Sequence, residues 1–243
     1  MISILQACNA FHTAVVSQTD DAQQEIFLKT IYSNLMQSSS TLIGQCVDEH
    51  LKSICSTDDG NTELGQLFQR LNRQYPGGDV GLFSIYFFNY IRLQPGESIL
   101  LKANIPHAYI HGQCIECMAC SDNVVRAGLT PKFKDIPTLI EMLDYKPLTI
   151  EQTKFQGKKL SENIFEFDPK QSSSIDDFVV QEIRGQQGTI TSLSRPSLMV
   201  IVEGQGVMNN GKTKFKPATV FLIEKNLTID FVADDQLLAY RAY

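Results

Sequence analysis

Residues 104–132 read NIPHAYIHGQCIECMACSDNVVRAGLTPK. From the histidine at position 107 to the final lysine, the stretch carries an aromatic hydroxyl, two carboxylates, an arginine and three cysteines. Few purely structural segments need this mixture, whereas a site that holds a metal ion and an anionic, hydroxylated ligand does. The stretch therefore predicts a functional site in the middle of the chain.

The sequence on the amino-terminal side of this stretch is helical in character. Apolar residues recur with roughly helical spacing over residues 22–36 and 64–71, and Tyr75-Pro76-Gly77-Gly78 is a clear stop. After this stop, residues 82–93 are rich in Phe, Tyr and Ile and predict a buried strand. Residues 98–103 predict a second strand, so His107 would lie just past a strand end.

On the carboxyl-terminal side, residues 138–143 predict a short helix. Residues 146–177 are polar and rich in serine, which indicates a linker with little regular structure. Strands are expected at residues 198–202, 219–223, 227–231 and 237–241, with a hairpin turn at Asn209-Asn210-Gly211-Lys212. Closely spaced strands with turn signals are typical of a jelly roll or a small barrel.

Composition excludes several classes of protein. The chain has 243 residues, 43% hydrophobic and 20% charged, with a net charge of −6, which argues against a general nucleic-acid binder. No apolar stretch reaches the roughly 18 residues of a membrane span. Residues 1–10 lack a cationic start followed by a long apolar core, so we expect no secretory signal. The six cysteines are then expected to be reduced thiols in a cytoplasmic protein.

Each candidate residue has a structural and a functional interpretation. A histidine after a strand, such as His107, can be a metal ligand or a structural residue. The pattern of Cys114, Cys117 and Cys120 suggests part of a zinc or iron–sulfur site. In a regular strand, however, Cys117 would face away from the other two, so packing in a core is the better interpretation.

The charged residues of the stretch also leave two interpretations open. Glu116 and Asp122 would share a face of a regular strand, and they could form either a polar site or a solvated face. Arg126 and Lys132 are either ordinary surface charges or a phosphate clamp, for which a guanidinium is well shaped.

Residues 83–145 resemble the central segment of the type I mannose-6-phosphate isomerases, a zinc-dependent cupin family. The resemblance is carried by PHAY at 106–109, ECMACSDN at 116–123 and RAGLTPK at 126–132. The helical start and the carboxyl-terminal strands fit the family more loosely, so the resemblance covers nearly all of the chain. It implies a mainly β protein with an α-helical segment and cupin-type jelly-roll barrels. The implied parts are a helical segment (1–78), a partial catalytic barrel (79–145), a linker (146–177) and a carboxyl-terminal cupin-like β domain (178–243).

The resemblance implies an aldose–ketose isomerase that interconverts mannose 6-phosphate and fructose 6-phosphate and supplies mannose for GDP-mannose synthesis. It implies His107 as a zinc ligand, and Arg126 and Lys132 as partners of the substrate phosphate. Its implied catalytic residues are Arg126, Glu116, Asp122 and Tyr109.

The family's zinc has four protein ligands, and only His107 has a counterpart here; the other three belong to an amino-terminal half that this sequence lacks. The chain alone is therefore expected to bind zinc weakly and to be inactive, and the full-length form is expected to be a monomer. The alternative is a truncated, non-catalytic cupin remnant that binds a sugar or a partner chain.

Overall fold

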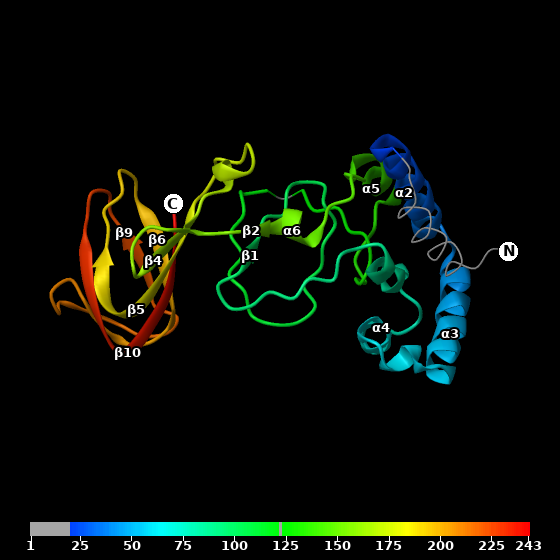
Figure 1. Ribbon diagram of the computed structural model, residues 1–243, viewed down its shortest axis with the longest axis horizontal. Coiled ribbons are helices and arrows are strands. Elements are labelled where there is room, and N and C mark those ends of the chain that lie inside the picture. The colour runs from blue at the N-terminus through cyan, green and yellow to red at the C-terminus, as the bar shows by residue number, and fades with distance from the viewer. Residues whose placement is uncertain (1–19, 122) are drawn as a thin grey trace. The chain divides into compact units, whose positions relative to one another are not determined.

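The computed structural model describes residues 20–121 and 123–243, which divide into two compact units (Figure 1). Within these described ranges, the first unit contains residues up to 92 together with 101–109 and 123–153. The second unit contains residues 93–100, 110–121 and 154–243. The stretch 104–132 is therefore shared between the two units.

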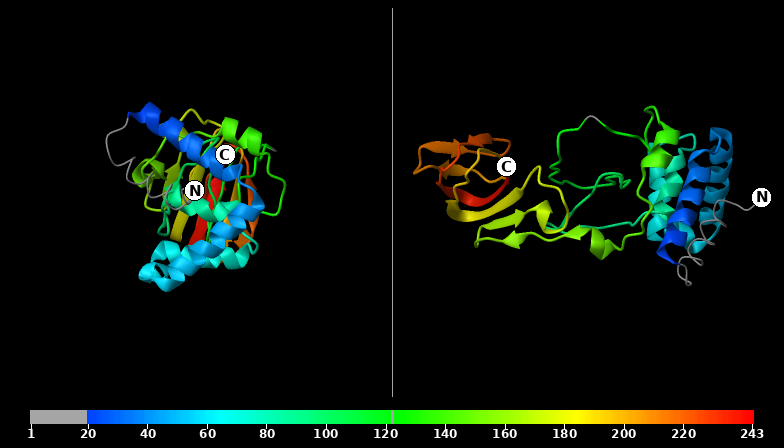
Figure 2. Two further views of the ribbon diagram at one scale, coloured as in Figure 1. Left: turned by 90° about the vertical axis from the view of Figure 1, so that its right-hand side faces the viewer. Right: turned by 90° about the horizontal axis from the view of Figure 1, so that it is seen from above.

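Helices make up the first unit, and their blue-to-cyan members lie together in both views of Figure 2. Its elements are α2 (Asp21–Met36), α3 (Ser40–Ser56), η1 (Asp58–Asn61), α4 (Glu63–Gln74), η2 (Val80–Tyr86), α5 (Ile136–Met142) and α6 (Ile150–Thr153). Polar side chains start the longer helices. Ser39 accepts a hydrogen bond from the amide of Leu42 at 3.2 Å, and Thr62 accepts one from Gly65 at 3.1 Å.

Aromatic side chains form the core of the first unit. Phe68 on α4 is fully buried, with its ring centroid 4.6 Å from that of His50 on α3 and 5.7 Å from that of Phe83 on η2. The hydroxyl of Tyr86 lies 2.6 Å from Nε2 of His50. The strand expected at residues 82–93 is wrong, because residues 82–86 lie in η2 and residues 87–93 have irregular backbone. A short apolar run fits a buried helix as well as a buried strand, and here Asp79 caps η2 by accepting from Gly81 at 2.7 Å.

The second unit is an antiparallel sheet. Its strands are β3 (Lys158–Lys159), β4 (Ile164–Phe167), β5 (Val180–Ile190), β6 (Ser197–Glu203), β7 (Gly206–Met208), β8 (Thr213–Phe215), β9 (Val220–Ile223) and β10 (Ile229–Ala242). The order is β3-β4-β5-β10-β6-β9, with β7 paired to both β10 and β8. A two-stranded sheet joins β1 (Ser98–Ile99) to β2 (Lys154–Phe155), and η3 (Pro169–Gln171) follows β4. The expectation of a mainly β protein with a helical segment is confirmed.

Strand alternation builds the core of this sheet. On β10, Leu237, Ala239 and Arg241 are buried, while the residues between them are partly exposed. Leu237 and Ala239 pack with apolar side chains of β4, β5 and β6, because successive strand residues face opposite sides. The buried apolar cluster comprises Ile164, Ile183, Ile190, Met199, Ile201, Met208, Phe215, Ile223, Ile229, Phe231, Ala233, Leu237 and Ala239.

Several local expectations are confirmed. The strands at 198–202 and 219–223 correspond to β6 and β9, and the helix at 138–143 corresponds to α5. The hairpin turn at 209–212 lies between β7 and β8, with positive φ angles of 54° at Asn209, 53° at Asn210 and 78° at Gly211. Asparagine and glycine tolerate this left-handed backbone, which explains the strong local signal.

Other expectations need correction. The strands expected at 227–231 and 237–241 are one long strand, β10, with an irregularity in pairing between Val232 and Leu237. The strand expected at 98–103 is limited to β1. Residues 146–177 are not without regular structure, since β2, β3 and β4 lie there and β4 pairs with β5 over Ile164–Phe167. β2 and β3 have only two residues each and β4 has four, which is too short for an alternating pattern to stand out from the polar sequence around them.

The four-part division of the chain stays a prediction. Among the described residues of 79–145, β1 is the one strand, and the remainder is helix or irregular backbone. Residues 1–19 of the expected helical segment lie outside the described residues. Within the described ranges, no helix combines the length and the apolar character needed to cross a membrane.

Candidate functional site

The residues expected in the site fall into both units. His107, Tyr109, Arg126 and Lys132 belong to the first unit, and Glu116 belongs to the second. Asp122 lies outside the described residues. Apart from Asp122, residues 105–132 contain no helix or strand, so loops present all of these side chains.

His107 is held by its own loop. Its Nδ1 lies 2.9 Å from the carbonyl oxygen of Ile105, and a carbonyl can only accept, so Nδ1 carries the proton and donates. In the neutral ring the lone pair is then on the other nitrogen, Nε2, and the side chain is exposed. The same loop places the ring of Tyr109 with its centroid 5.9 Å from that of His107. A histidine oriented through Nδ1 in this way is typical of metal ligands.

Arg126 and Lys132 lie on either side of a fixed turn. Arg126 is half-buried and Lys132 is exposed. Between them, the amide of Leu129 donates a 2.7 Å hydrogen bond to Oδ1 of Asp79, which also caps η2. Sequence reasoning missed Asp79, because nothing local connects it to a residue 50 positions away. Its position between Gly78 and Gly81, before an apolar run, could have marked it as a cap.

Glu116 lies beside the sheet of the second unit. Together with Ile115 and Cys117 it lines a cavity of about 180 Å³ whose other side is formed by β6, β9, β10 and Val180 of β5. β10 contributes two ionisable residues to the lining, Tyr240 and Arg241, and the hydroxyl of Tyr240 donates to Glu182 at 3.0 Å. Burial first, and the Glu182 carboxylate second, raise the pKa of Tyr240 to about 12. Tyr240 therefore stays protonated and neutral beside Glu116 at physiological pH.

The core-packing interpretation of the three cysteines is wrong. Cys114 and Cys120 are exposed, and Cys117 is only half-buried, with a pKa raised by burial. They lie in irregular backbone, where no partner strand covers them as a regular sheet would. All of the described cysteines are free thiols.

A zinc site is not complete within the described part of the chain. There, no group of three or more His, Cys, Asp or Glu side chains comes close enough to hold a metal ion. His107 offers one well-oriented imidazole nitrogen, and protein zinc sites use three or four protein ligands. The described residues therefore do not fit a zinc ion by themselves.

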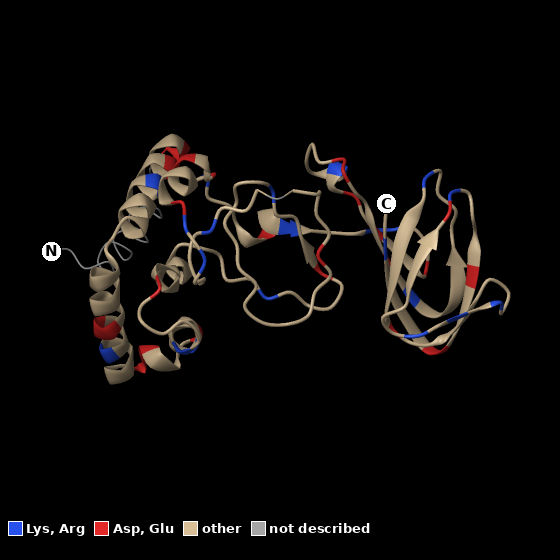
Figure 3. Ribbon diagram, turned by 180° about the vertical axis from the view of Figure 1, so that it is seen from behind, with Lys and Arg blue, Asp and Glu red and all other residues tan. Residues whose placement is uncertain are grey.

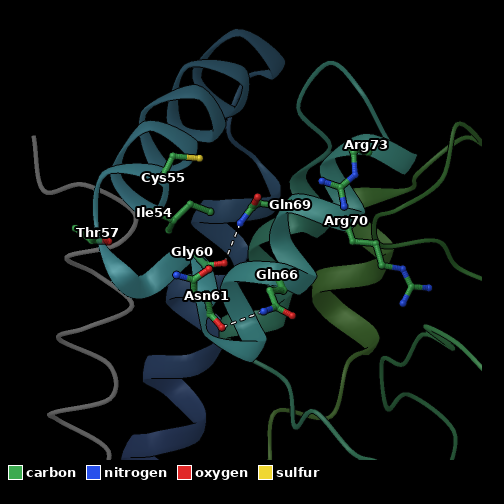
Figure 4. A pocket seen from close by; sticks show the side chains of 9 residues that line it. All are labelled: Ile54, Cys55, Thr57, Gly60, Asn61, Gln66, Gln69, Arg70 and Arg73. Carbon is green, nitrogen blue, oxygen red and sulfur yellow. Dashed lines mark hydrogen bonds between the residues drawn. The ribbon is translucent and has the colours of Figure 1, made fainter.

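A larger groove, of about 570 Å³, lies in the first unit and contains none of the expected site residues (Figure 4). It runs between the end of α3, η1 and α4. Gln69 donates to the carbonyl of Gly60 at 3.1 Å and Gln66 donates to that of Asn61 at 3.0 Å, so these amides tie α4 to η1. Arg70 and Arg73 complete its lining. These amide contacts are those of a helix junction, and we assign the groove no chemistry.

Comparison with known proteins identifies the class of fold. A solved structure of mannose 6-phosphate isomerase from Salmonella typhimurium, bound to fructose 6-phosphate and zinc, superposes with a TM-score of 0.72 at 23% identity. The alignment covers 100% of this chain and 60% of that one. The chain thus has the cupin-type, mainly antiparallel β fold with added helices that this isomerase shows.

The sequence matches are more specific. Residues 4–88 match the family described as phosphomannose isomerase type I, helical insertion domain. A protein named probable mannose-6-phosphate isomerase from Echinococcus multilocularis is 38% identical over 249 residues, which is 89% of this chain and 57% of that protein. The mannose-6-phosphate isomerase of Emericella nidulans is 36% identical over 256 residues, 91% of this chain and 55% of its own length. The chain belongs to the type I phosphomannose isomerase family and spans a little over half the length of these relatives.

Proposed function

We propose that this chain carries part of an active site that interconverts mannose 6-phosphate and fructose 6-phosphate. The match of about nine-tenths of its length to a relative named for this reaction carries the proposal. The arrangement of the first unit supports it, because a half-buried guanidinium and a lysine flank a turn that a 2.7 Å hydrogen bond from the amide of Leu129 ties to Asp79. Arginine and lysine side chains bind phosphate esters through charge-assisted hydrogen bonds.

The reaction assigns roles to the chain's own residues. Lys132 and Arg126 bind the phosphate of the open-chain sugar, and Tyr109 contacts a sugar hydroxyl. A base removes the proton from C2 of the aldose and an enediolate forms; the proton on O2 is transferred to O1 and a proton is returned to C1, which gives the ketose. The alternative role for Arg126 is to stabilise, with its guanidinium, the negative charge that develops on the enediolate, which leaves the phosphate to Lys132. Glu116 and Asp122 remain the two candidates for the base.

The proposal includes His107 as one ligand of a zinc ion. The Salmonella enzyme was solved with zinc and fructose 6-phosphate. In this chain, Nε2 of His107 is the atom we assign to such an ion, which when bound would polarise sugar oxygens. The remaining ligands must come from protein outside the described residues, because these hold no group of three ligands. Replacing Cys114, Cys117 and Cys120 together by serine should leave zinc stoichiometry unchanged.

The proposal also covers the cellular compartment, the binding partners and the oligomeric state of the protein. We assign the chain to the cytoplasm, which the free thiols of all described cysteines support. A sugar phosphate is the proposed partner, and nucleic acid is not. The net charge of −6 and the scattering of Lys and Arg among acidic residues along the ribbon support this (Figure 3). The complete protein is proposed to act as a monomer.

The test uses zinc content and turnover of mannose 6-phosphate, measured on two proteins. One is the purified chain, and the other is a chimera that joins it to the part of the Emericella nidulans relative left uncovered by the alignment. We expect weak zinc binding and no turnover for the chain, and one zinc ion with turnover for the chimera. A correctly folded chimera that binds zinc but does not turn over mannose 6-phosphate would contradict the proposal. It would instead favour a non-catalytic cupin that binds sugar.

Residue roles are tested in the active chimera. Arg126→Ala should lower turnover by about tenfold or more, since one charge-stabilising group contributes at least that much. Arg92→Ala is the matched control: Arg92 is an exposed arginine of the same unit that pairs with Glu63. It should leave turnover unchanged. Near wild-type kinetics for Arg126→Ala would remove Arg126 from the mechanism.

A further inference from the structure

We propose that Asp79 is a positioning residue that holds residues 126–132 in a single conformation and so sets the places of Arg126 and Lys132. The assignment of a phosphate to these two cations rests on the proposed function. The restraint of the turn by Asp79 is inferred from the contacts of Asp79 alone and does not depend on that function.

One carboxylate joins three separate points of the first unit. Oδ1 of Asp79 accepts hydrogen bonds from the amides of Gly81 and Leu129, both at 2.7 Å. Oδ2 lies 3.5 Å from Nζ of Lys134. The Asp79 side chain is only 12% exposed, so water competes little for these bonds. The contacts connect the start of η2 to a turn 50 residues later and to a lysine 55 residues later.

The backbones of the two segments approach so closely that only glycine fits at the contact. A methyl group on Gly128 would lie 2.5 Å from Cα of Gly81, and one on Gly81 would lie 2.7 Å from the amide nitrogen of Leu129. Cβ atoms essentially never come this close to backbone atoms. The two glycines therefore let the turn sit directly on η2, within reach of the carboxylate.

The turn itself has an unfavourable backbone. Leu129 has a φ of +53°, a conformation that non-glycine residues seldom adopt. Such a residue persists when surrounding contacts over-determine it, and here the bond to Asp79 is the direct restraint. Arg126 lies three residues before Leu129 and Lys132 three residues after it. Without the carboxylate, the turn can relax and both cations lose their fixed separation.

Three substitutions separate the contribution of the Asp79 hydrogen bonds from that of its ion pair with Lys134. Asp79→Ala removes all of the carboxylate's hydrogen bonds and its ion pair. Asp79→Asn keeps an oxygen for the two amides but places an amide group beside the ammonium of Lys134. Lys134→Met removes only the ion pair. Asp168→Asn is the matched control, because Asp168 also caps a 3-10 helix, η3, through the amide of Lys170 at 3.0 Å, and it lies in the other unit.

Amide hydrogen exchange on the purified chain measures the pinning. In Asp79→Ala, exchange over residues 126–132 should rise by about tenfold or more, with a smaller rise in Asp79→Asn. Lys134→Met and Asp168→Asn should change it by less than about threefold. Unchanged exchange in both Asp79 variants would overturn the inference. If Asp79→Ala exchanges fast throughout the first unit, Asp79→Asn decides the question by whether its rise is confined to residues 126–132.

Kinetics of the chimera test the consequence for the cations. Asp79→Asn should raise KM for mannose 6-phosphate by about tenfold while kcat falls less. The reason is that a misplaced cation weakens binding of the phosphate equally in the ground state and in the transition state. Faster exchange with unaltered KM and kcat would leave Asp79 a purely structural cap and overturn the positioning role. If the wild-type chimera shows no turnover, the proposed function fails, and the exchange data alone then decide whether Asp79 pins the turn.

Discussion

Replacing Phe68 by alanine should remove the centre of the helical unit. The side chain is fully buried, and its ring packs edge-to-face on His50 with centroids 4.6 Å apart, and against Phe83 and Tyr86 at 5.7 and 6.3 Å. Truncating a buried phenylalanine costs about 3–5 kcal/mol through the forfeited transfer free energy and the cavity left behind. Because Phe68 packs against three other rings, we expect the free energy of unfolding to fall by about 4 kcal/mol.

A change of this size lowers the folding equilibrium constant by roughly a thousandfold. The assay is urea unfolding followed by the helical band of far-ultraviolet circular dichroism. Every α-helix in the described chain belongs to the first unit, so this signal follows that unit. Phe133→Ala is the control, because Phe133 is 85% exposed and its replacement should change stability by less than about 0.5 kcal/mol. Equal stabilities for the two variants would refute the packing described around Phe68.

Three further outcomes are expected. Burial lowers the pKa of His50 below 6.5, so the unfolded state takes up a proton first, and the first unit should lose stability as pH falls from about 7.5 to about 5.5 in urea titrations. A flat profile would contradict a buried neutral imidazole. Ser197→Ala removes the hydroxyl that accepts from Nε of the fully buried Arg241 at 2.8 Å, and the opening free energy of β10 in hydrogen exchange should fall by about 1–3 kcal/mol. Gly65→Ala places a methyl group on the carbonyl oxygen of Asp59 and should lower the thermal midpoint of the helical signal, whereas an unchanged midpoint would show that η1 moves aside freely.

Local signals in the sequence carried much of the fold. Helical spacing and the stop at residues 75–78 placed α2 and α4, and Asn209-Asn210-Gly211 placed a hairpin, because positive φ angles favour those residue types. The motif from His107 to Lys132 identified the family, which depends on residue identity and needs no folded geometry. For the site, the sequence supplied the chemical groups and left their arrangement open.

Tertiary structure decided what depends on partners distant in the chain. Residues 82–86 of the aromatic run lie in η2, where Phe83 packs on Phe68 of α4 and near His50 of α3, whereas the run alone fits a strand equally well. β10 is one strand because β5 pairs with it on both sides of the irregularity between Val232 and Leu237. Cys114 and Cys120 are exposed because their segment has no partner strand in the described chain. The sequence by itself determined which residues carry the chemistry, and only packing over a separation of 50 residues brought Asp79 to Leu129 to hold the turn between Arg126 and Lys132.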